Sequence, residues 1–354
     1  MNQYYNLMAC PLCRGKLTLK TFETEADKVK EGILICEPCN KKFMIVDFIP
    51  RMVPVNLYRN NEFQKKHAIQ DNELLLSFDQ TESLETLQEN TDFYFGQEWE
   101  YYARLGWEGN TEFTYDESVK NFWSKTLLEK DDVCGKLILD GGCGNGRYSR
   151  IAMENGAKGV VSVDIGRNVD VAKSNLHNVG LDVFVVQADL LHLPFSPNVF
   201  DLVFTIGVLQ HTGAPQEAFQ SLVSVLKKSG LIAIRAYQRG NPTLEENDRK
   251  IREVTTKFSI EELHEFSKIL FDLYNFAEKK NLVYQLKHYI NIFSIQHSIF
   301  DWYAAPIADK FTYPQIREWF SQAGIKDIRN LEHRNAPEEK RIFSAISIVG
   351  EKMV

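Results

Sequence analysis

Short apolar runs alternate with amphipathic stretches through the central part of the chain. Five runs are typical of buried strands in a parallel sheet, and they span 136–140, 159–164, 183–187, 200–205 and 230–236. Helical patterns fill the intervals at 146–155, 167–178 and 215–228, and Gly230 after Lys227 and Lys228 indicates where the last one stops. This alternation predicts an α/β fold with a doubly wound, mostly parallel sheet.

The pattern changes after the fifth strand. From 241 to about 300 there are two or three helical patterns and no clear strand, and Ser259 with Glu262 forms a capping-box signature. The helix that follows should bury one apolar face, made of Leu263, Phe266, Ile269, Leu270 and Leu273. A helix near 313–323 and two strands near 325–333 and 341–349 predict an antiparallel closing pair. The chain therefore divides into five segments, which are 1–57, 58–128 (linker and helical segment), 129–240 (core), 241–310 (helical insertion) and 311–354.

The first predicted strand ends in a turn rich in glycine. Asp140 closes the strand, and Gly142, Gly144 and Gly146 let the backbone approach a ligand without interference from a Cβ atom. The next helix points its free N–H groups toward the same place. Arg147 stands where the third glycine of a dinucleotide fingerprint would be. The turn therefore indicates a nucleotide-like cofactor other than a dinucleotide.

Acidic and apolar residues follow the next strands. Ligands of a doubly wound sheet lie at the carboxyl ends of its strands. Asp164 suits the ribose hydroxyls there, although taken alone it is equally suited to cap a helix. Asp189 could accept a hydrogen bond from an adenine amine, while Leu190 and Ile165 pack against the ring. The fourth strand continues into Ile206, beneath the cofactor.

These segments, taken together over 137–236, resemble in order and spacing the motifs of class I S-adenosylmethionine-dependent methyltransferases. The resemblance implies a Rossmann-like sheet of seven strands, S-adenosylmethionine as cofactor, and transfer of its sulfonium methyl by in-line displacement. The cofactor-binding residues that it implies are Asp140, Gly142, Gly144, Gly146, Asp164, Ile165, Asp189, Leu190 and Ile206.

Two residues are candidates for acting on the acceptor. His211 follows the fourth strand and could orient or deprotonate a nucleophile, or it could cap the following loop. Tyr237 follows the fifth strand and could line the pocket or be an ordinary half-buried tyrosine. The aromatic clusters at 93–102 and 300–303 either close over the cofactor or pack in the core. Arg147 either meets the cofactor carboxylate or lies exposed on its helix.

Four cysteines near the N-terminus form two C-x-x-C knuckles. Cys10, Cys13, Cys36 and Cys39 can direct four thiolates to one point, which suits a structural, tetrahedral zinc ion better than a redox dithiol. Residues 7–53 resemble the small zinc-ribbon proteins that bind and activate several methyltransferases of the translation apparatus. Here the ribbon precedes the core in one chain, where it could stabilise the sheet, contact substrate or recruit another protein.

Composition limits the function further. The 354 residues are 44% hydrophobic and can bury a large core, and they include no apolar run long enough to cross a membrane. The net charge of −7 argues against a broad nucleic-acid footprint, and six cysteines without a signal sequence indicate the cytoplasm. We expect a methyltransferase for a small-molecule or saccharide-type acceptor. The alternatives are an RNA or protein acceptor with the ribbon as docking arm, and a non-catalytic activator that keeps the cofactor fold. The sequence does not predict an oligomeric state.

Overall fold

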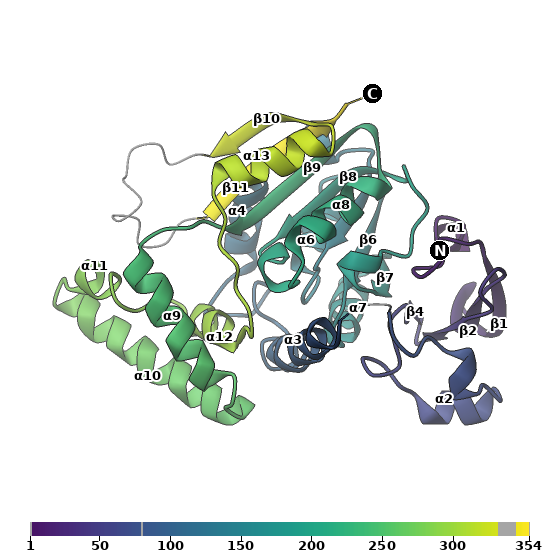
Figure 1. Cartoon of the computed structure of the whole chain (residues 1–354), viewed down its shortest axis with the longest axis horizontal. Helices are drawn as coiled ribbons and strands as arrows, with labels where there is room; N and C mark the ends of the chain where they lie inside the picture. Colours follow the sequence, from purple (N-terminus) through teal and green to yellow (C-terminus); the bar gives the residue numbers. More distant parts are fainter. Residues whose placement is uncertain (1, 79–80, 332–344, 354) are drawn as a thin grey trace.

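A seven-stranded sheet forms the centre of the molecule (Figure 1). The computed structural model describes the chain except residues 1, 79–80, 332–344 and 354. The strands follow the order β10-β11-β9-β8-β5-β6-β7. Strands β5 to β9 pair in parallel, while β11 pairs antiparallel with both of its neighbours, β9 and β10. Their bounds are β5 Leu137–Gly141, β6 Gly159–Asp164, β7 Phe184–Gln187, β8 Phe200–Ile206, β9 Leu226–Tyr237, β10 Ile325–Leu331 and β11 Ala345–Lys352. The predicted doubly wound, mostly parallel sheet is confirmed.

Helices cover both faces of this sheet. One apolar core joins the sheet to α4 (Tyr115–Thr126), α6 (Arg147–Glu154) and α7 (Asn168–Asn178), and α5 (Lys130–Val133) precedes β5. The opposite core includes α8 (Pro215–Val225), α13 (Tyr313–Gln322) and the short helix α1 (Asn2–Tyr5). Single 3-10 turns, η2 (Leu190–His192) and η3 (Leu209–His211), follow β7 and β8. This arrangement leaves the carboxyl ends of the parallel strands free to form a site.

The helical insertion contains four helices, where the sequence predicted two or three. These are α9 (Pro242–Thr255), α10 (Ile260–Lys279), α11 (Val283–Leu286) and α12 (Gln296–Ala304). The capping box of Ser259 and Glu262 is confirmed at the start of α10. The apolar face of α10 was predicted wrongly at Ile269, which is 64% exposed. The buried residues Leu263, Leu270 and Ala277 define the inner face of α10, and Ile269, about 100° around the helix from Leu270, lies outside it.

Two further boundaries differ from the prediction. Helix α8 ends at Val225, and β9 begins at Leu226 rather than at 230. Lys227 and Lys228 therefore lie in a strand irregularity and not in the last helical turn, and Lys227 Nζ donates to Asp201 Oδ1 over 2.7 Å. The closing pair is confirmed as antiparallel strands, but positions 332–333 and 341–344 of that prediction lie outside the described residues. The division into five segments remains a proposal.

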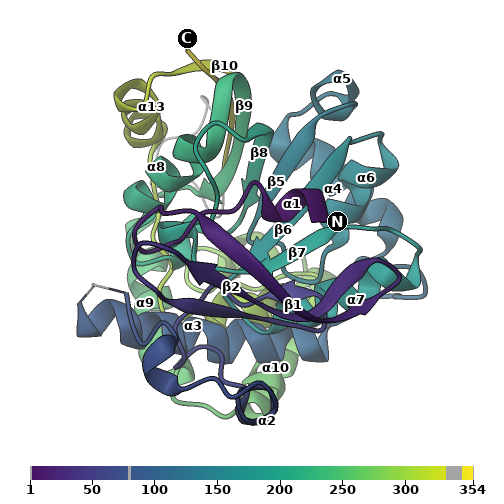
Figure 2. The ribbon, with the colours of Figure 1, turned by 90° about the vertical axis from the view of Figure 1, so that its right-hand side faces the viewer.

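The N-terminal ribbon has its own four-stranded antiparallel sheet, which packs beside the edge strand β7 (Figure 2). Its strands are β1 (Leu17–Glu25), β2 (Lys28–Cys36), β3 (Lys42–Val46) and β4 (Ile49–Pro50), and α2 (Asn61–Lys66) and η1 (Asp71–Glu73) follow it. The rings of Tyr4 and Tyr5 lie 5.2 and 5.3 Å from that of Phe184 on β7. The ribbon thus covers an edge that would otherwise expose unpaired backbone groups.

Arg51 ties the ribbon to the central sheet. Its guanidinium lies within 2.5 Å of Asp170 Oδ1 on α7 and donates to Gln187 Oε1 over 3.2 Å. The Met52 N–H donates to the Gln187 carbonyl over 2.8 Å, and the Gln187 side chain donates to the Ile165 carbonyl over 2.9 Å. A chain of contacts therefore leads from the ribbon to the loop after β6.

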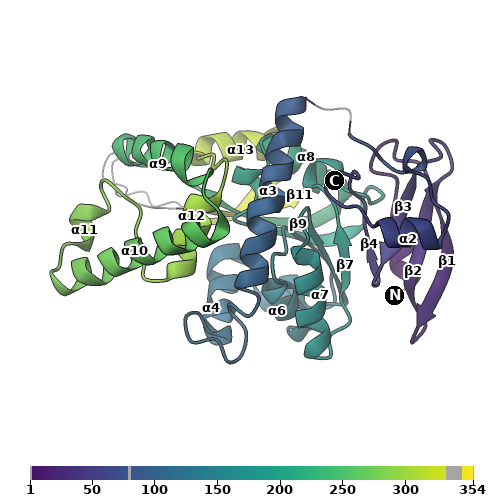
Figure 3. The same ribbon diagram turned by 90° about the horizontal axis from the view of Figure 1, so that it is seen from below.

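Helix α3 (Glu82–Tyr101) crosses the molecule between the ribbon and the helical insertion (Figure 3). Its N-cap, Thr81, accepts a hydrogen bond from the Leu84 N–H. Tyr94, Leu105 and Tyr303 belong to one apolar core that joins the end of α3 to the helical insertion. None of the described helices combines the length and apolar character needed to cross a bilayer.

We predict that Arg51→Met lowers the free energy of unfolding. Arg51 is only 3% exposed, and its loss leaves the buried Oε1 atom of Gln187 without its donor, which costs about 2 kcal/mol. The ion pair adds little because Asp170 is half exposed. Urea unfolding followed by circular dichroism measures the change. Lys30→Met, which removes an exposed ion pair within the ribbon, is the matched control and should leave the midpoint where it is. Equal midpoints for Arg51→Met and the wild type would contradict the prediction.

Candidate cofactor cavity and metal centre

A cavity lies at the carboxyl ends of β5, β6 and β8, with α3 across it. Seven of the nine predicted cofactor residues line it, namely Gly142, Gly144, Asp164, Ile165, Asp189, Leu190 and Ile206. Helix α3 contributes one face of four residues, spaced three or four apart: Gln88, Thr91, Phe95 and Trp99. The remaining wall comes from the loop after β6 with Gly166, from the segment after β8 with Gly207, Val208, His211 and Thr212, and from α12 with Asp301.

The glycine turn is shaped by protein side chains as well as by space for a ligand. Gly142 has φ +86°, and a Cβ there would lie 2.2 Å from Val208 Cγ2. Gly144 has φ +54°, and a Cβ there would lie 3.0 Å from Trp99 Cε2. Both positions therefore need glycine for backbone conformation and for packing. The Trp99 indole lies directly over the turn and narrows the cavity.

Asp164 joins the turn to the end of β6. Its Oδ2 accepts the Gly144 N–H over 2.9 Å, and its Oδ1 accepts the Gly166 N–H over 3.3 Å. Burial raises the pKa of Asp164, although these backbone hydrogen bonds oppose the rise. Asn168 and the Ile165 N–H also act on this carboxylate, which accepts hydrogen bonds only and so suits donors such as ribose hydroxyls.

Asp189 is held from three sides at the other end of the cavity. Its Oδ1 accepts the Leu191 N–H over 2.9 Å, and its Oδ2 accepts from Gln88 Nε2 over 2.8 Å. His192 Nδ1 lies 2.9 Å from the same Oδ2. The apolar side chains of Ile165 and Leu190 line the same cavity. Sequence reasoning missed Gln88, because nothing local marks a glutamine on a distant helix.

Three predicted residues are not on the cavity wall. Asp140 is 2% exposed and accepts a hydrogen bond from Ser149 Oγ over 2.5 Å, and burial raises its pKa to about 7. Gly146 caps α6, where a Cβ would crowd Ala172. Tyr237 lies behind His211, with ring centroids 5.6 Å apart. Any contact of these three with a ligand would need a rearrangement, so their assigned roles stay predictions.

His211 lines the cavity but is tied to its surroundings. Its Nδ1 lies 2.6 Å from the Ile307 carbonyl oxygen, so the ring donates there and keeps Nε2 as an acceptor. Burial lowers the pKa of His211 to about 4, and the ring is therefore neutral at physiological pH. His211 is thus fixed to the segment around Ile307 and also lines the cavity, and both roles considered from the sequence, action on the acceptor and capping of the following loop, stay predictions.

The two aromatic clusters pack together, with the ring centroids of Tyr102 and Phe300 5.7 Å apart. Trp99 on α3 lies 5.3 Å, ring to ring, from His297 on α12. The Arg147 guanidinium lies 4.9 Å from the Trp99 centroid, and its Nε and Nη1 atoms are buried without a hydrogen-bond partner among the described residues. Arg147 is thus neither exposed nor on the cavity wall. The sequence left open whether these clusters close over a ligand or pack in the core, and it did not single out Asp301.

The charge of the cavity wall is one-sided. Its charged lining residues are Asp164, Asp189 and Asp301, and the described lining includes no lysine or arginine. Low-dielectric walls strengthen the field of such groups. A cation or a neutral hydrogen-bond donor therefore suits this cavity better than an anion.

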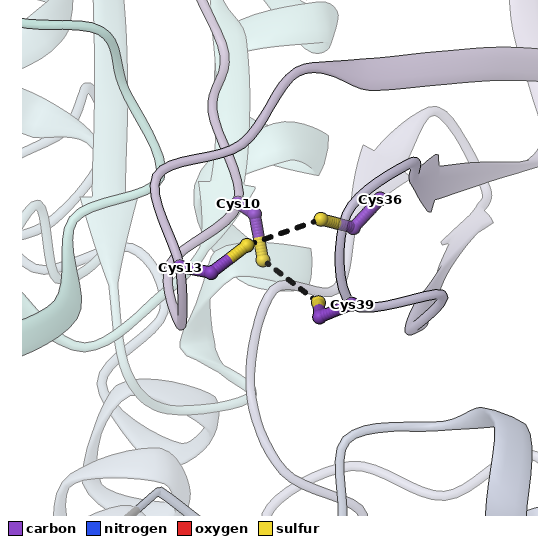
Figure 4. A group of neighbouring side chains, drawn as sticks. All are labelled: Cys10, Cys13, Cys36 and Cys39. Carbon is purple, nitrogen blue, oxygen red and sulfur yellow. Dashed lines mark hydrogen bonds between the residues drawn. The ribbon is translucent and has the colours of Figure 1, made fainter.

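Four cysteine sulfurs converge in the ribbon (Figure 4). Cys10, Cys13, Cys36 and Cys39 place all four Sγ atoms within 4.8 Å of one another. The contact between Cys10 and Cys39 is 3.7 Å, and that between Cys13 and Cys36 is 3.3 Å. A tetrahedral zinc ion with Zn–S bonds of about 2.3 Å separates its sulfurs by roughly 3.8 Å. The group therefore fits such an ion closely, while Cys134 and Cys143 lie outside it.

Comparison with known proteins identifies two domains. Residues 139–234 match the family model of the methyltransferase domain, and residues 4–47 match that of Trm112p-like proteins. The chain is 26% identical over 157 residues to the ubiquinone biosynthesis O-methyltransferase of Vibrio cholerae, which covers 44% of this chain and 64% of that protein. It is 30% identical over 115 residues to the tRNA U34 carboxymethyltransferase of Cellvibrio japonicus, covering 32% and 36% respectively. The chain thus spans less than two thirds of these curated relatives.

Solved structures with a similar fold include the Burkholderia thailandensis 1,6-didemethyltoxoflavin-N1-methyltransferase with bound S-adenosylhomocysteine. Its TM-score is 0.46 at 14% identity, and the match covers 78% of this chain and 92% of that one. Another is a complex between the Haloferax volcanii Trm112 methyltransferase activator and a methyltransferase, at TM-score 0.40 and 15% identity, covering 73% and 98%. The two family matches lie in separate parts of the sequence. This chain therefore combines a Trm112p-like domain at residues 4–47 with a methyltransferase domain at residues 139–234.

Proposed function

We propose that this protein transfers a methyl group from S-adenosylmethionine to a small-molecule or saccharide-type acceptor. The observation that carries the proposal is a single cavity, lined by Gly142, Gly144, Asp164 and Asp189, within a methyltransferase domain. The cofactor supplies a methyl group on a sulfonium sulfur, which is open to in-line attack. The protein's part is to align a nucleophile with that methyl and to exclude water.

The cavity wall supplies suitable partners for each part of the cofactor. Asp189 with its apolar neighbours Ile165 and Leu190 suits the adenine, and Asp164 suits the ribose hydroxyls. The buried Nε and Nη1 groups of Arg147 have no partner among the described residues and suit the carboxylate of the cofactor's methionine part. The Trp99 side chain lies over Arg147, so this contact requires Trp99 to move. Orphaned buried donors are costly unless a ligand satisfies them.

A small acceptor agrees with the shape and charge of the site. Helix α3 lies across the cavity, and the wall carries three aspartates and no cation among its described residues. Recognition of a nucleic-acid backbone rests on lysine and arginine contacts to phosphates. The aromatic rings of Phe95 and Trp99 offer flat apolar surfaces to a small ring or sugar.

An RNA acceptor is the second candidate. The Trm112p-like domain and the similarity to a tRNA-modifying enzyme favour it. It would require cationic residues on the path from ribbon to cavity, and the three aspartates of the wall oppose that requirement. Electrophoretic mobility shift with bulk tRNA separates the candidates, since salt-sensitive binding is expected only for an RNA substrate.

We further propose that the ribbon acts as an activator built into the chain. Arg51 holds Gln187, and the Gln187 side chain holds the carbonyl of Ile165, which lines the cavity. The zinc ion would keep the ribbon folded, because a module of this size has little core of its own. Through these contacts the ribbon would support the loop after β6, which lines the cofactor cavity.

Asp164→Ala tests the cofactor site. We expect the affinity for S-adenosylhomocysteine, measured by isothermal titration calorimetry, to fall at least about tenfold, because two hydrogen-bond acceptors are lost. Asp164→Asn keeps one acceptor and should lose less. Asp131→Ala, an exposed acid on α5, is the control and should bind as the wild type does. A wild-type protein that binds neither S-adenosylmethionine nor S-adenosylhomocysteine would refute the enzymatic proposals and favour a non-catalytic activator.

Cys13→Ser tests the metal site. We expect the wild type to hold one zinc per chain by plasma mass spectrometry, and the variant to lose it together with thermal stability. Cys134→Ser, an exposed thiol outside the cluster, should retain the metal. Equal zinc content in the two variants would exclude the four-cysteine site.

A further inference from the structure

Polar groups that cofactor binding does not use lie between α3 and α12, beside the cavity. Glu98 on α3 is fully buried, and neither of its carboxyl oxygens makes a hydrogen bond to another described residue. Its Oε1 lies 2.7 Å from His297 Nε2 on α12. Asp301, one helical turn further along α12, lines the cavity itself. Buried unsatisfied groups of this kind are rare in structural cores and point to a ligand or a reaction.

Glu98 and His297 form an uncharged pair at neutral pH. Burial raises the pKa of Glu98 to about 8 and lowers that of His297 to about 4. The two side chains are in contact, but Glu98 Oε1 and His297 Nε2 do not form a hydrogen bond in this arrangement. The backbone N–H of His297 is also fixed, because it donates to Glu112 Oε1 over 2.9 Å. The contact between Glu98 and His297 therefore joins α3 to α12 through two groups that are uncharged at neutral pH.

Asp301, unlike Glu98, lies on the cavity wall. Its carboxylate has no hydrogen-bond partner among the described residues, and it faces the cavity that His211 also lines. Burial raises its pKa to about 7, and the neighbouring Glu98 adds to the rise. The other titratable or charged groups that act on it come from α4, α6, α12 and β9: Lys125, Arg147, His297 and Tyr237.

His211 is less suited than Asp301 to accept a proton. Its Nδ1 is committed to the Ile307 carbonyl, and its Nε2 lies 3.3 Å from Gln210 Nε2. A base works best when its pKa lies near the working pH, and the value for His211 is about 4. His211 can orient an acceptor, while the group with a free carboxylate and a near-neutral pKa is Asp301.

We propose that Asp301 faces the transferred methyl and takes the proton of the acceptor's nucleophile, and that the acceptor presents a hydroxyl or amine and no negative charge of its own. This inference rests on the proposed methyl transfer. A lone pair on the acceptor oxygen or nitrogen forms the new bond to the methyl carbon. The carbon–sulfur bond breaks, and its electron pair stays on sulfur as a neutral thioether. The acceptor's proton passes to the Asp301 carboxylate and then to solvent.

The experiment compares two cofactor analogues that differ at the reacting centre. Sinefungin carries an ammonium group where the methyl would lie, whereas S-adenosylhomocysteine carries a neutral sulfur. Calorimetry with the full-length protein at pH 8 gives the ratio of the two affinities. We expect the wild type to prefer sinefungin and Asp301→Asn to reduce that preference roughly tenfold, with little change for S-adenosylhomocysteine. Asp301→Glu keeps a carboxylate and should therefore retain part of the preference for sinefungin.

Two controls separate the possible outcomes. Asp272→Asn, an exposed acid on α10, should keep the wild-type ratio. At pH 6 most of the Asp301 carboxyl is protonated, because its pKa is about 7. The wild-type ratio of sinefungin affinity to S-adenosylhomocysteine affinity should then approach that of Asp301→Asn at pH 8. This second measurement uses the wild type alone. An unchanged ratio in Asp301→Asn, or one that does not fall between pH 8 and pH 6, overturns the inference. Failure of the wild type to bind either analogue would instead overturn the proposed function.

Discussion

The contact between Trp99 and the glycine turn determines the shape of this site. The indole lies where a Cβ of Gly144 would be 3.0 Å away, so α3 and the end of β5 can approach only because residue 144 is glycine. The same helix brings Gln88 to Asp189 on the cavity wall and Glu98 to His297 beside the cavity. One packing contact thus sets the position of the helix that forms a wall of the cavity and reaches α12.

The site concentrates buried carboxyl groups, and this has a cost in stability. Burial raises the pKa values of Asp140, Glu98 and Asp301 to between about 7 and 8. Because the folded-state pKa is higher than that of the unfolded chain, the stability that these groups contribute is complete at acidic pH and is lost as the pH rises through 7 to 8. Acids retained under such conditions are typical of functional sites, since an apolar side chain would stabilise the fold better.

The sequence predicts those parts of the site that depend on local order. The five parallel strands, the glycine turn, Asp164, Asp189 and the cysteine knuckles each lie at a fixed place relative to a strand end or a tight turn. The wall formed by α3 depends instead on packing between segments far apart in sequence, so neither Gln88 nor Asp301 could be assigned. The start of β9 was misplaced for a related reason, because its pairing with β8 extended the strand through a Lys-Lys-Ser-Gly stretch that locally favours a helix end.

The edge strand β7 explains where the ribbon packs against the central sheet. This strand is four residues long and has no partner on its outer side within the central sheet. Exposed edges invite unwanted pairing, and the ribbon covers this one with Tyr4, Tyr5 and the Arg51–Gln187 bridge. The amide of Gln187 in turn fixes the carbonyl of Ile165 on the cavity wall. Protection of the edge and support of the cofactor loop therefore depend on the same few contacts, so loss of the ribbon should affect both together.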